Sequence, residues 1–429
     1  MNPSQPSTSL LSKPNHLAHL GQLTPGVLFV TGRAGTGKST LLREFVSQSG
    51  LNCAVVAPTG LAALNVGGQT IHSFFRIKPG PVISDSEHVP VFRPGHPKWR
   101  LMKNMDVLVI DEISMVRADL LDAMDYSLRA NLKSEEPFGG KRVVVFGDLL
   151  QLEPVVRRGA EMEMMLDLYA SPFFFDAKVL RNFPMEILEL TEVHRQAGDQ
   201  DFVWALNELR QGKTEVLDAI NERVGASLDG REVTLHTRNA GVLAMNMERL
   251  MRLSGSSREF KATFTGDSID ETPTDPLLTL KLGARVMFVR NGTEWVNGTL
   301  GTVTGFPEEG GVKVEKDDGE TVTVGPETWE KVRWSWDGMR HRIAAEVTGT
   351  FTQIPLKLAW ALTVHKSQGL TFDQVRLDFG QGAFAHGQLY VALSRCRTLA
   401  GLSLAHPLKP TDLIINERVL EFWTQTGLF

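Results

Sequence analysis

Residues 32–39 read Gly32-Arg33-Ala34-Gly35-Thr36-Gly37-Lys38-Ser39, and they follow an apolar run at 27–30. The spacing fits the pattern G-x-x-x-x-G-K-[ST], in which glycines let backbone N–H groups turn toward phosphates. A helix that begins at the end of such a loop adds the positive end of its dipole. A chance glycine-rich turn is the alternative, but the strand before the loop and the helical pattern after it argue against that interpretation. The stretch therefore predicts an α/β domain that binds nucleotide phosphates.

Two residues of this loop have individual roles. Lys38 would reach the β- and γ-phosphates of ATP, and the Ser39 hydroxyl would bind Mg²⁺. We therefore expect ATP and Mg²⁺ as cofactors. The other candidate ATP-binding positions of the loop are Gly32, Gly35, Thr36, Gly37 and Thr40.

An acidic pair, Asp111-Glu112, ends the apolar run at 107–110. Such a pair often only carries a strand out into water, but beside a phosphate loop the catalytic interpretation is favoured. Asp111 would hold the metal ion through water, and Glu112 would take a proton from the attacking water. Gln151 follows the apolar run at 143–146, and it can orient that water or sense the γ-phosphate. These roles are those of a nucleotide hydrolase.

The apolar runs also predict the organisation of the chain. Buried runs at 27–30, 54–57, 107–110 and 143–146 are typical of a parallel sheet, which places a first α/β domain at 1–180. Within it, a Pro- and Gly-rich excursion at about 76–104 has no clear period. Met185–Leu190 resembles the first strand of a second α/β domain, expected at 181–252 and 353–429. Short strands and tight turns at 253–352 predict a small β-barrel inserted in that domain.

Composition limits the remaining classes of function. The 429 residues are too many for one hydrophobic core. Because the net charge is -5, any polyanion must bind in a local groove rather than through an overall field. Two cysteines cannot form a disulfide scaffold, and no apolar run is long enough to span a bilayer. These features favour a cytoplasmic protein without a membrane partner, associated with the nucleoid if it acts on DNA.

Read together, the motifs resemble those of superfamily-one helicases, and most closely the Pif (petite integration frequency) family, which is related to RecD. The resemblance covers about residues 11–405, and the motifs follow the family's order. The motifs are GRAGTGKST at 32–40, APTGLAA at 57–63, TIHSF at 70–74, DEISM at 111–115, GDLLQLEPVV at 147–156, LTEVHRQ at 190–196, LTVHKSQGLTF at 362–372 and YVALSRCRT at 390–398. The resemblance implies two RecA-like P-loop NTPase domains with an SH3-like barrel inserted in the second. It also implies ATP-driven 5′-to-3′ movement on single-stranded DNA.

The resemblance also assigns residues of the second domain to the nucleotide. Arg395 matches the family's arginine finger, which stabilises the charge on the γ-phosphate, and Arg195 matches a second arginine. Arginine suits this role because it is always charged and offers a fork of donors. Gln368 and Gly369 match ATP-binding positions, whereas Arg397 is either structural or near DNA.

DNA contacts are implied in both domains. The matching positions are Thr59, Gly60, Thr70 and His72 in the first domain and Thr363, His365, Lys366 and Ser367 in the second. Hydroxyls, N–H groups and cations contact phosphates without reading bases. His72 alone would more often be a packed core histidine. The excursion at 76–104 can act as a wedge at forked or structured DNA, with Phe92 or Trp99 either stacked on a base pair or packing the loop.

Two positions depart from the family's pattern. Asn15 stands where the family often has an adenine-reading glutamine; it keeps the amide but is one carbon shorter. Glu153 stands where a proline is usual, so coupling through this loop differs.

Alternative functions stay open at this point. The chain can be a translocase that strips proteins from single strands, or a nucleotide-gated DNA-binding subunit of a larger repair complex. A small-molecule kinase is the remaining P-loop class, but the second-domain motifs argue against it. For the leading function, a DNA helicase, we expect a monomer, with single-strand-binding or repair proteins as candidate partners.

Overall fold

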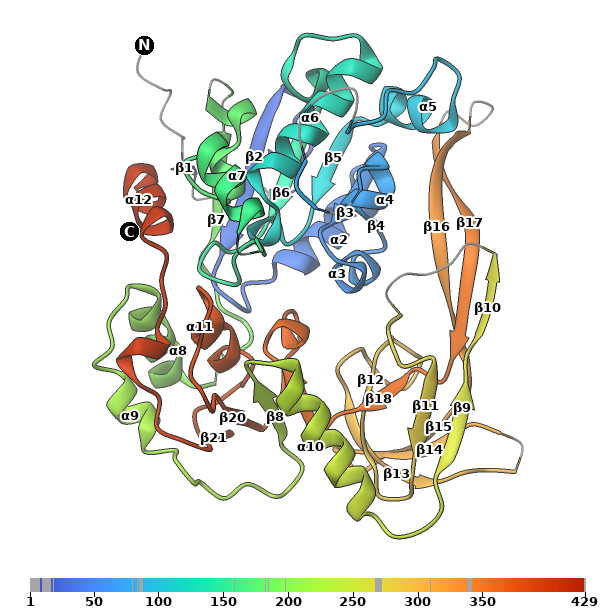
Figure 1. The fold of residues 1–429 in the computed structure, drawn as a ribbon, viewed down its shortest axis with the longest axis vertical. Coiled ribbons are helices and arrows are strands. Elements are labelled where there is room, and N and C mark those ends of the chain that lie inside the picture. Colours follow the sequence, from blue (N-terminus) through green and yellow to red (C-terminus); the bar gives the residue numbers. More distant parts are fainter. Residues whose placement is uncertain are drawn as a thin grey trace. The chain divides into compact units, whose positions relative to one another are not determined.

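Two parallel sheets organise the chain, one in each of the two units into which it divides (Figure 1). The computed structural model describes residues 8–9, 17, 19–78, 80–82, 84, 88–157, 159–181, 183, 185–196, 198–266, 272–308, 310–337 and 342–427. The first unit contains residues 1–194, 332–346 and 416–429, and the second contains 195–331 and 347–415. The chain therefore passes from one unit to the other more than once.

The sheet of the first unit has seven parallel strands in the order β1-β7-β2-β6-β5-β3-β4. Its strands are β1 (Thr8–Ser9), β2 (Gly26–Gly32), β3 (Cys53–Ala57), β4 (Gln69–Thr70), β5 (Val107–Ile110), β6 (Arg142–Phe146) and β7 (Met185–Leu190). All residues of β2, β5 and β6 are buried. The four strands predicted from apolar runs are thus confirmed, and burial on both faces explains their lack of alternation.

Helices accompany these strands in the first unit. They are α2 (Lys38–Gln48), α3 (Gly60–Asn65), α4 (Ile71–Phe75), α5 (Pro97–Asn104), α6 (Ala118–Leu132), α7 (Ala160–Leu168) and α12 (Glu417–Thr426), with 3-10 turns η1 (Ile113–Met115), η2 (Pro137–Gly140), η3 (Phe174–Asp176) and η4 (Lys178–Arg181). Leu41, Leu42 and Phe45 of α2 pack on the sheet in one apolar cluster. Within the described ranges, the chain has no helix that is both long and apolar enough to cross a membrane.

Helix α6 buries a row of polar side chains that bind the backbone of surrounding loops. Asp119 accepts a hydrogen bond from the Val82 amide at 2.9 Å, and Asp122 accepts from the Val179 amide at 2.9 Å. The Asp125 carboxylate accepts from the Phe138 amide at 2.6 Å. Since an unpaired amide is costly to bury, these bonds hold irregular segments firmly on the helix.

The boundary between the two α/β domains differs from the prediction in two places. Met185–Leu190 is a strand, as expected, but it pairs with β2 in the first sheet instead of opening the second. The last helix, α12, also belongs to the first unit, because Trp423 stacks on Phe29 with ring centroids 6.3 Å apart. Arg418 of α12 pairs with Asp176 at 2.6 Å. The prediction that the first domain ends at residue 180 and that the second continues to residue 429 is therefore wrong. Strand β7 and helix α12 both belong to the first unit.

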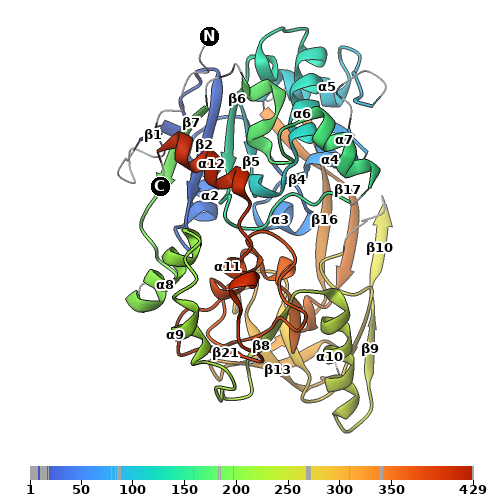
Figure 2. The same cartoon turned by 60° about the vertical axis from the view of Figure 1, so that its left-hand side comes forward.

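The second unit has a four-stranded parallel sheet in the order β19-β8-β20-β21. Its strands are β8 (Val233–His236), β19 (Ala361–Thr363), β20 (Val375–Asp378) and β21 (Leu402–Leu404). The helical elements around it are α8 (Gln200–Arg210), α9 (Leu217–Asn221), α10 (Asn239–Arg252), η5 (His365–Ser367), α11 (Gln388–Leu393) and η6 (Pro410–Asp412). Helix α11 packs against α8, and Figure 2 shows the two helices side by side.

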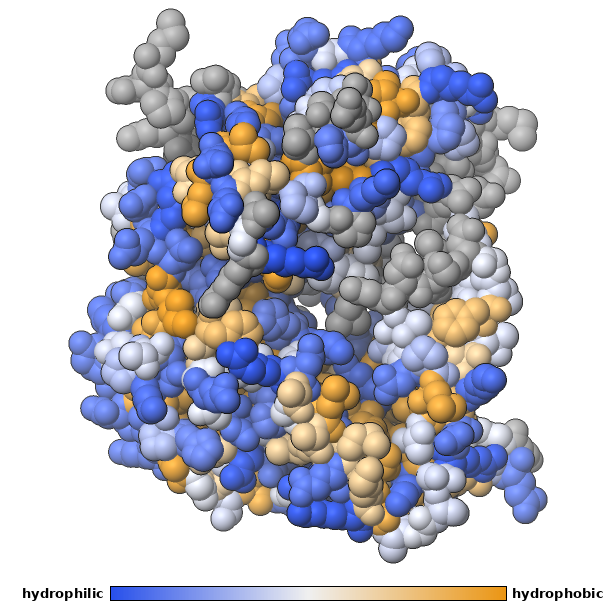
Figure 3. All heavy atoms as spheres, in the orientation of Figure 1, coloured by the Kyte–Doolittle hydropathy of each residue, from blue (hydrophilic) through white to orange (hydrophobic). Residues whose placement is uncertain are grey.

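Helix α10 is attached to this sheet by an amide as well as by apolar packing. The Asn246 side chain donates to the Ala361 carbonyl at 3.0 Å and accepts from the Ala361 amide at 2.9 Å. An adjacent face of α10 carries Leu243, Met247 and Met251, which are 65%, 46% and 70% exposed. Apolar side chains accordingly appear over α10 in the space-filling view (Figure 3). Only a narrow strip of α10, which includes the buried Asn246 and Leu250, is therefore packed against the rest of the unit.

Antiparallel strands form the module predicted as a barrel. Their bounds are β9 (Arg258–Lys261), β10 (Thr263–Gly266), β11 (Leu277–Leu280), β12 (Arg285–Phe288), β13 (Leu300–Gly305), β14 (Val312–Lys316), β15 (Thr321–Val324), β16 (Glu327–Asp337), β17 (Arg342–Gln353) and β18 (Leu356–Leu358). The main sheet has the order β15-β14-β13-β12-β18. A single apolar cluster joins it to β11 and to Leu250 of α10. The five-stranded sheet of the module therefore packs as part of the second unit, whereas residues 332–346, which include parts of β16 and β17, belong to the first unit.

The docking of α12 generates a stability prediction. Trp423 is 3% exposed, so Trp423→Ala should leave a cavity and cost about 3–5 kcal/mol of unfolding free energy. Trp204 on α8 is 57% exposed, and Trp204→Ala should cost less than about 0.5 kcal/mol. Urea unfolding followed by circular dichroism measures both. Equal midpoints for the two variants would show that α12 does not contribute to the first unit's core.

Candidate functional site

The phosphate loop lies between β2 and α2, and two of its glycines are required, Gly32 by close packing and Gly37 by its backbone conformation. A Cβ on Gly32 would lie 2.4 Å from the Leu190 carbonyl oxygen and 2.8 Å from Thr36 Oγ1. Gly37, the N-cap of α2, has φ 85° in the left-handed region. The loop therefore can wrap closely around a ligand at the start of α2, as the sequence predicts.

Lys38 folds back over this loop. Its Nζ donates to the Gly32 carbonyl at 2.7 Å and to the Arg33 carbonyl at 3.0 Å. The Thr36 hydroxyl also donates to the Arg33 carbonyl, at 2.9 Å, and so closes the turn. The ammonium group is thus held at the loop, where its charge can meet the phosphates of a nucleotide.

The acidic pair lies at the carboxyl end of β5, at the same edge of the sheet. Asp111 is 7% exposed, and burial together with the neighbouring Glu112 carboxylate raises its pKa to about 7. Lys38 is among the cations that oppose this shift, so the two side chains lie near each other. Glu112 has φ 50°, which is strained for a residue other than glycine. Such strain is often stored at functional sites.

The donors at this edge fit a hard divalent cation. Asp111 supplies a carboxylate and Ser39 a hydroxyl, the oxygen ligands that Mg²⁺ prefers. The raised pKa of Asp111 shows that its buried charge lacks full compensation by the protein. A cation would supply that compensation, so the residues present fit Mg²⁺.

Gln151 follows β6 and is held by Asp148. Its Nε2 donates to Asp148 Oδ2 at 3.3 Å, while Asp148 Oδ1 accepts from the Leu150 amide at 3.1 Å. Gln151 is 5% exposed. A Cβ on Gly147 would lie 2.8 Å from Ile113 Cγ2, so this turn packs against the segment after Glu112. The structure thus brings Gln151 to the same edge as the acidic pair.

The predicted DNA-contacting residues of the first unit lie at or just after the ends of β3 and β4. Thr59 Oγ1 accepts from the Ala62 amide, and Thr70 Oγ1 accepts from the Ser73 amide, both at 3.2 Å. Thr59 therefore precedes α3, which begins at Gly60, and Thr70 precedes α4. The hydroxyl of each threonine can still donate a hydrogen bond to a phosphate. His72 Nδ1 lies 3.2 Å from the Ile77 carbonyl, and burial lowers the pKa of His72. The His72 side chain thus helps to hold the chain at Ile77 in place after α4.

Arg395 is buried within its own unit. It is 1% exposed, and its Nε donates to the Val391 carbonyl at 2.9 Å. A second nitrogen donates to the Leu370 carbonyl at 3.2 Å, and a third to Ser394 Oγ at 2.9 Å. The guanidinium group therefore ties α11 to the segment after η5. Its assignment as the arginine finger stays a prediction, and it requires these bonds to be exchanged for phosphate.

Arg195 and Gln196 are attached to the same corner. Arg195 donates to the Ser394 carbonyl at 3.1 Å, and the Gln196 amide donates to the carbonyls of Ser394 and Cys396 at 3.1 and 3.0 Å. Arg195 is only half-buried. Arg397, in contrast, forms an exposed ion pair with Asp373 at 3.1 Å. The two motifs that carry Arg195 and Arg395 are thus joined through Ser394.

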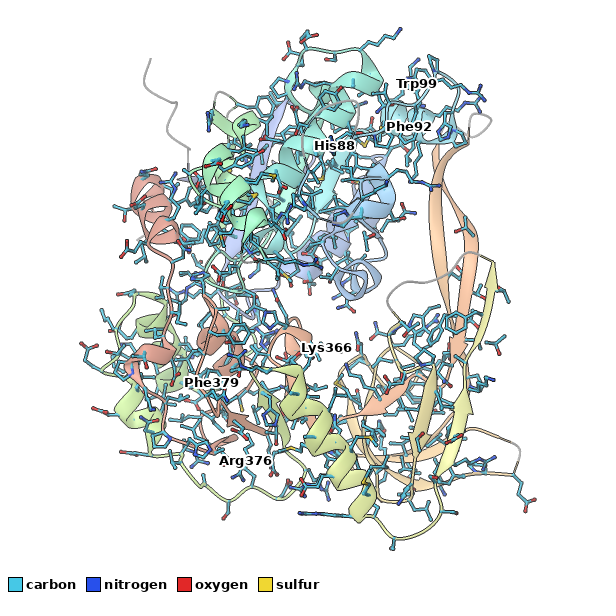
Figure 4. All side chains as sticks on the ribbon, in the orientation of Figure 1. His88, Phe92, Trp99, Lys366, Arg376 and Phe379 are labelled. Atoms are coloured by element: carbon cyan, nitrogen blue, oxygen red, sulfur yellow. The ribbon has the colours of Figure 1, made fainter. Side chains whose placement is uncertain are left out.

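The motif around η5 divides into internal and exposed residues. The Thr363 hydroxyl accepts from the Lys366 amide at 3.2 Å, and the fully buried Ser367 hydroxyl donates to the Val364 carbonyl at 2.8 Å. Both hydroxyls therefore shape the turn. Gly369 has φ 80°, which favours glycine at the end of Gln368-Gly369. Lys366 projects from η5 (Figure 4).

An aromatic platform beside this motif was missed by the sequence analysis. The His365 ring stacks on Phe384 with centroids 6.3 Å apart and planes at 19°, and the Arg238 guanidinium lies 4.6 Å above the Phe384 ring. Phe384 is 48% exposed. An apolar residue in a glycine-rich loop gives no local signal, because its neighbours come from distant segments.

The excursion is fixed to α6 through its aromatic residues. The Phe92 amide donates to Asn131 Oδ1 at 2.6 Å, and Trp99 Nε1 donates to the Asn131 carbonyl at 2.8 Å. Phe92 also stacks on His96, with centroids 4.7 Å apart, and Figure 4 shows Phe92 and Trp99 at the same end of the first unit. These contacts favour the packing alternative for both residues. The wedge role of the loop stays a prediction, and Asn15 lies outside the described residues.

Comparisons with known proteins agree with this architecture. The model of PIF1-like helicases matches residues 17–220, and that of the UvrD-like helicase C-terminal domain matches residues 358–403. The ATP-dependent DNA helicase PIF1 of Rattus norvegicus is 36% identical over 418 residues, which cover 92% of this chain and 61% of that protein. The crystal structure of Bacteroides sp Pif1 in complex with ADP-AlF4 is 36% identical, with a TM-score of 0.86 over 98% of both chains. Bacteroides Pif1 bound to ssDNA matches with 36% identity and a TM-score of 0.71 over 97% of both chains.

The fold and the phosphate loop define a P-loop protein with two RecA-like domains. Its sequence identity to the PIF1 helicases, over nearly the whole chain, narrows this class: the chain belongs to the PIF1-like helicase family. The predicted fold class, α/β with two RecA-like domains, is thereby confirmed. The chain spans about three fifths of the length of the curated mammalian relatives that it matches.

The three arginines of this corner generate a prediction. If Arg395 is the finger, Arg395→Ala should reduce ATP turnover by 10³–10⁵. Because its guanidinium is buried with several hydrogen bonds, the same change should also lower the melting temperature. Arg195→Ala should reduce turnover with a smaller stability loss, and Arg397→Ala should change neither strongly. Steady-state turnover and thermal melting of all three variants check this. Normal ATP turnover in Arg395→Ala, together with loss of turnover in Arg397→Ala, would show that the arginine finger was assigned to the wrong residue.

Proposed function

We propose that this chain is an ATP-dependent DNA helicase that moves 5′-to-3′ on single-stranded DNA and unwinds forked or otherwise structured DNA. The observation that carries the proposal is the set of Lys38, Asp111 and Glu112 at the carboxyl edge of the first sheet. This set suits hydrolysis of a nucleoside triphosphate. The relatives named helicases, and the related chains solved with ADP-AlF4 and with ssDNA, support extending the activity to this chain.

Each residue of this edge has a distinct task in the proposed reaction. Lys38 places positive charge against the β- and γ-phosphates, while Ser39 and Asp111 would hold Mg²⁺, which neutralises phosphate charge when bound. Glu112 accepts the proton of the attacking water as that water bonds to the γ-phosphorus. Gln151, fixed by Asp148, orients the water. The ADP oxygen leaves on the opposite side.

The proposed DNA contacts are sequence-independent. Hydroxyl groups of Thr59 and Thr70 and the cation of Lys366 suit phosphate oxygens. The Phe384 ring, exposed and flanked by His365 and Arg238, suits a base, because every base has a face on which an aromatic ring can stack. We further propose that the chain works as a monomer in the cytoplasm, near the nucleoid, and meets single-strand-binding or repair proteins on DNA.

Duplexes with a single-stranded tail at either end test the proposal. The chain with ATP should separate the strands of a 5′-tailed duplex and leave a 3′-tailed duplex intact. Displacement of a bound protein without strand separation would instead indicate a translocase. Equal unwinding from either tail would contradict the proposed direction.

Glu112→Gln provides the matched test of the chemistry. The change keeps shape and removes the proton acceptor, so ATP binding should persist while turnover falls by 10²–10⁴. Equilibrium binding of a fluorescent ATP analogue and single-turnover hydrolysis measure the two effects. Turnover close to that of the unaltered chain would exclude Glu112 as the general base.

Phe384→Ala tests the aromatic platform. Loss of stacking should weaken binding of single-stranded DNA by about 1–3 kcal/mol while basal ATP turnover without DNA stays unchanged. Phe264 of β10, which is 48% exposed in the same unit, provides the control, and Phe264→Ala should leave affinity nearly unchanged. Fluorescence anisotropy with an unstructured oligonucleotide measures both variants. Equal affinities would remove Phe384 from the DNA site.

A further inference from the structure

One largely buried arginine of the first unit has no place in the roles above. Arg117 is the N-cap residue of α6, shortly after the acidic pair and η1, and its side chain is 11% exposed. Its backbone is held by the chain before η3: Arg117 forms a β-bridge with Phe173, and the Ala118 amide donates to the Pro172 carbonyl at 2.9 Å. The guanidinium group therefore extends from a fixed point of the chain.

This guanidinium group joins three segments of the first unit. Its Nε donates to Asp119 Oδ1 at 2.9 Å, in the first turn of α6. One terminal nitrogen donates to the Gly80 carbonyl at 2.8 Å, in the excursion at 76–104, and the other donates to the Glu161 carboxylate, in the first turn of α7. Arginine suits such a junction because its planar fork holds several donors in fixed directions, whereas lysine offers one compact charge.

The excursion is held at this junction by two neighbouring backbone groups. The Gly80 carbonyl binds Arg117, and the Val82 amide donates to Asp119 Oδ2 at 2.9 Å. Asp119 is fully buried and is itself bound by Arg117, so the two contacts form one network. The start of the excursion therefore keeps its place only while Arg117 and Asp119 keep theirs.

The third segment of the junction leads to the nucleotide edge. Glu161 Oε1 accepts from Arg117, and Glu161 Oε2 accepts from the Arg157 amide at 3.3 Å. Arg157 directly follows the motif at 147–156, which contains Gln151. The Glu161 carboxylate thus connects Arg117 to the chain that leaves the glutamine proposed to orient the attacking water.

We propose that Arg117 is a positioning residue that couples the chain after Gln151 to the excursion at 76–104, so that strand separation keeps step with ATP hydrolysis. The inference rests on the proposed helicase function. In this role Arg117 acts through Glu161 on one side and through Gly80 on the other. Its contact with Glu161 joins two opposite charges, and such charge-assisted hydrogen bonds are about twice as strong as neutral ones. A displacement of the chain after Gln151 is therefore passed to the excursion.

Strand separation and ATP turnover, both measured with a forked 5′-tailed duplex, test the proposal. Glu161→Gln keeps the shape of the side chain and leaves the bond between Arg117 and Gly80 in place, but it removes the charge that holds Arg117 to α7. Unwinding should fall on the order of tenfold. ATP turnover stimulated by unstructured single-stranded DNA should stay close to that of the unaltered chain. Arg117→Lys should give the same split, because one ammonium group cannot replace the three contacts.

Two further variants separate coupling from a general loss of stability. Arg129→Lys is the matched control, because Arg129 also lies on α6 but pairs with Asp125 of the same helix, at 2.8 Å, and it should change neither rate. The double variant Arg117→Lys/Glu161→Gln should unwind no more slowly than Arg117→Lys, since both changes remove one shared contact.

Three results would overturn the proposal. The first is unaltered unwinding in Glu161→Gln. The second is a parallel fall of unwinding and ATP turnover with a lower melting temperature, which indicates a contact that only stabilises the fold. The third is a double variant whose loss is the product of the two single losses. If the unaltered chain itself fails to separate the strands, the proposed function fails instead.

Discussion

Parallel strands place their carboxyl ends along one edge of a sheet, and the candidate catalytic residues of the first unit all depend on this constraint. Gly32 ends β2, Asp111 follows β5, and Gly147 follows β6. Residues more than a hundred positions apart thus share one edge without any long connection. The same rule acts in the second unit, where Thr363 ends β19 and is followed by η5. The candidate functional residues of both units are therefore positioned by the direction of the strands as well as by side-chain packing.

Buried polar groups give the edges their rigidity. Asp148 fixes Gln151, and Arg395 ties the end of α11 to the chain after η5. In the first unit, helix α6 accepts hydrogen bonds from the backbone amides of surrounding loops through Asp119, Asp122 and Asp125. Each bond satisfies a group that is costly to leave unpaired in the interior. The loops can therefore be irregular and still hold a defined position.

The sequence predicted the strands, the phosphate loop and the motif order, because these depend on local pattern and spacing. It placed Met185–Leu190 in the wrong domain, since an apolar strand has the same period whichever sheet it joins. The packing of α12 on Phe29 and the platform at Phe384 were also missed. Each depends on contacts between segments distant in sequence. The burial of Arg395 was not foreseen either, because an arginine after an apolar run is more often exposed.

The central claim is that the edge around Lys38 and Glu112 hydrolyses ATP in response to DNA. Steady-state ATP turnover, measured with and without unstructured single-stranded DNA, tests it most directly. The account predicts slow turnover alone, a large increase with DNA, and loss of both rates in Lys38→Ala. Turnover that is insensitive to DNA, or that survives in Lys38→Ala, would contradict it.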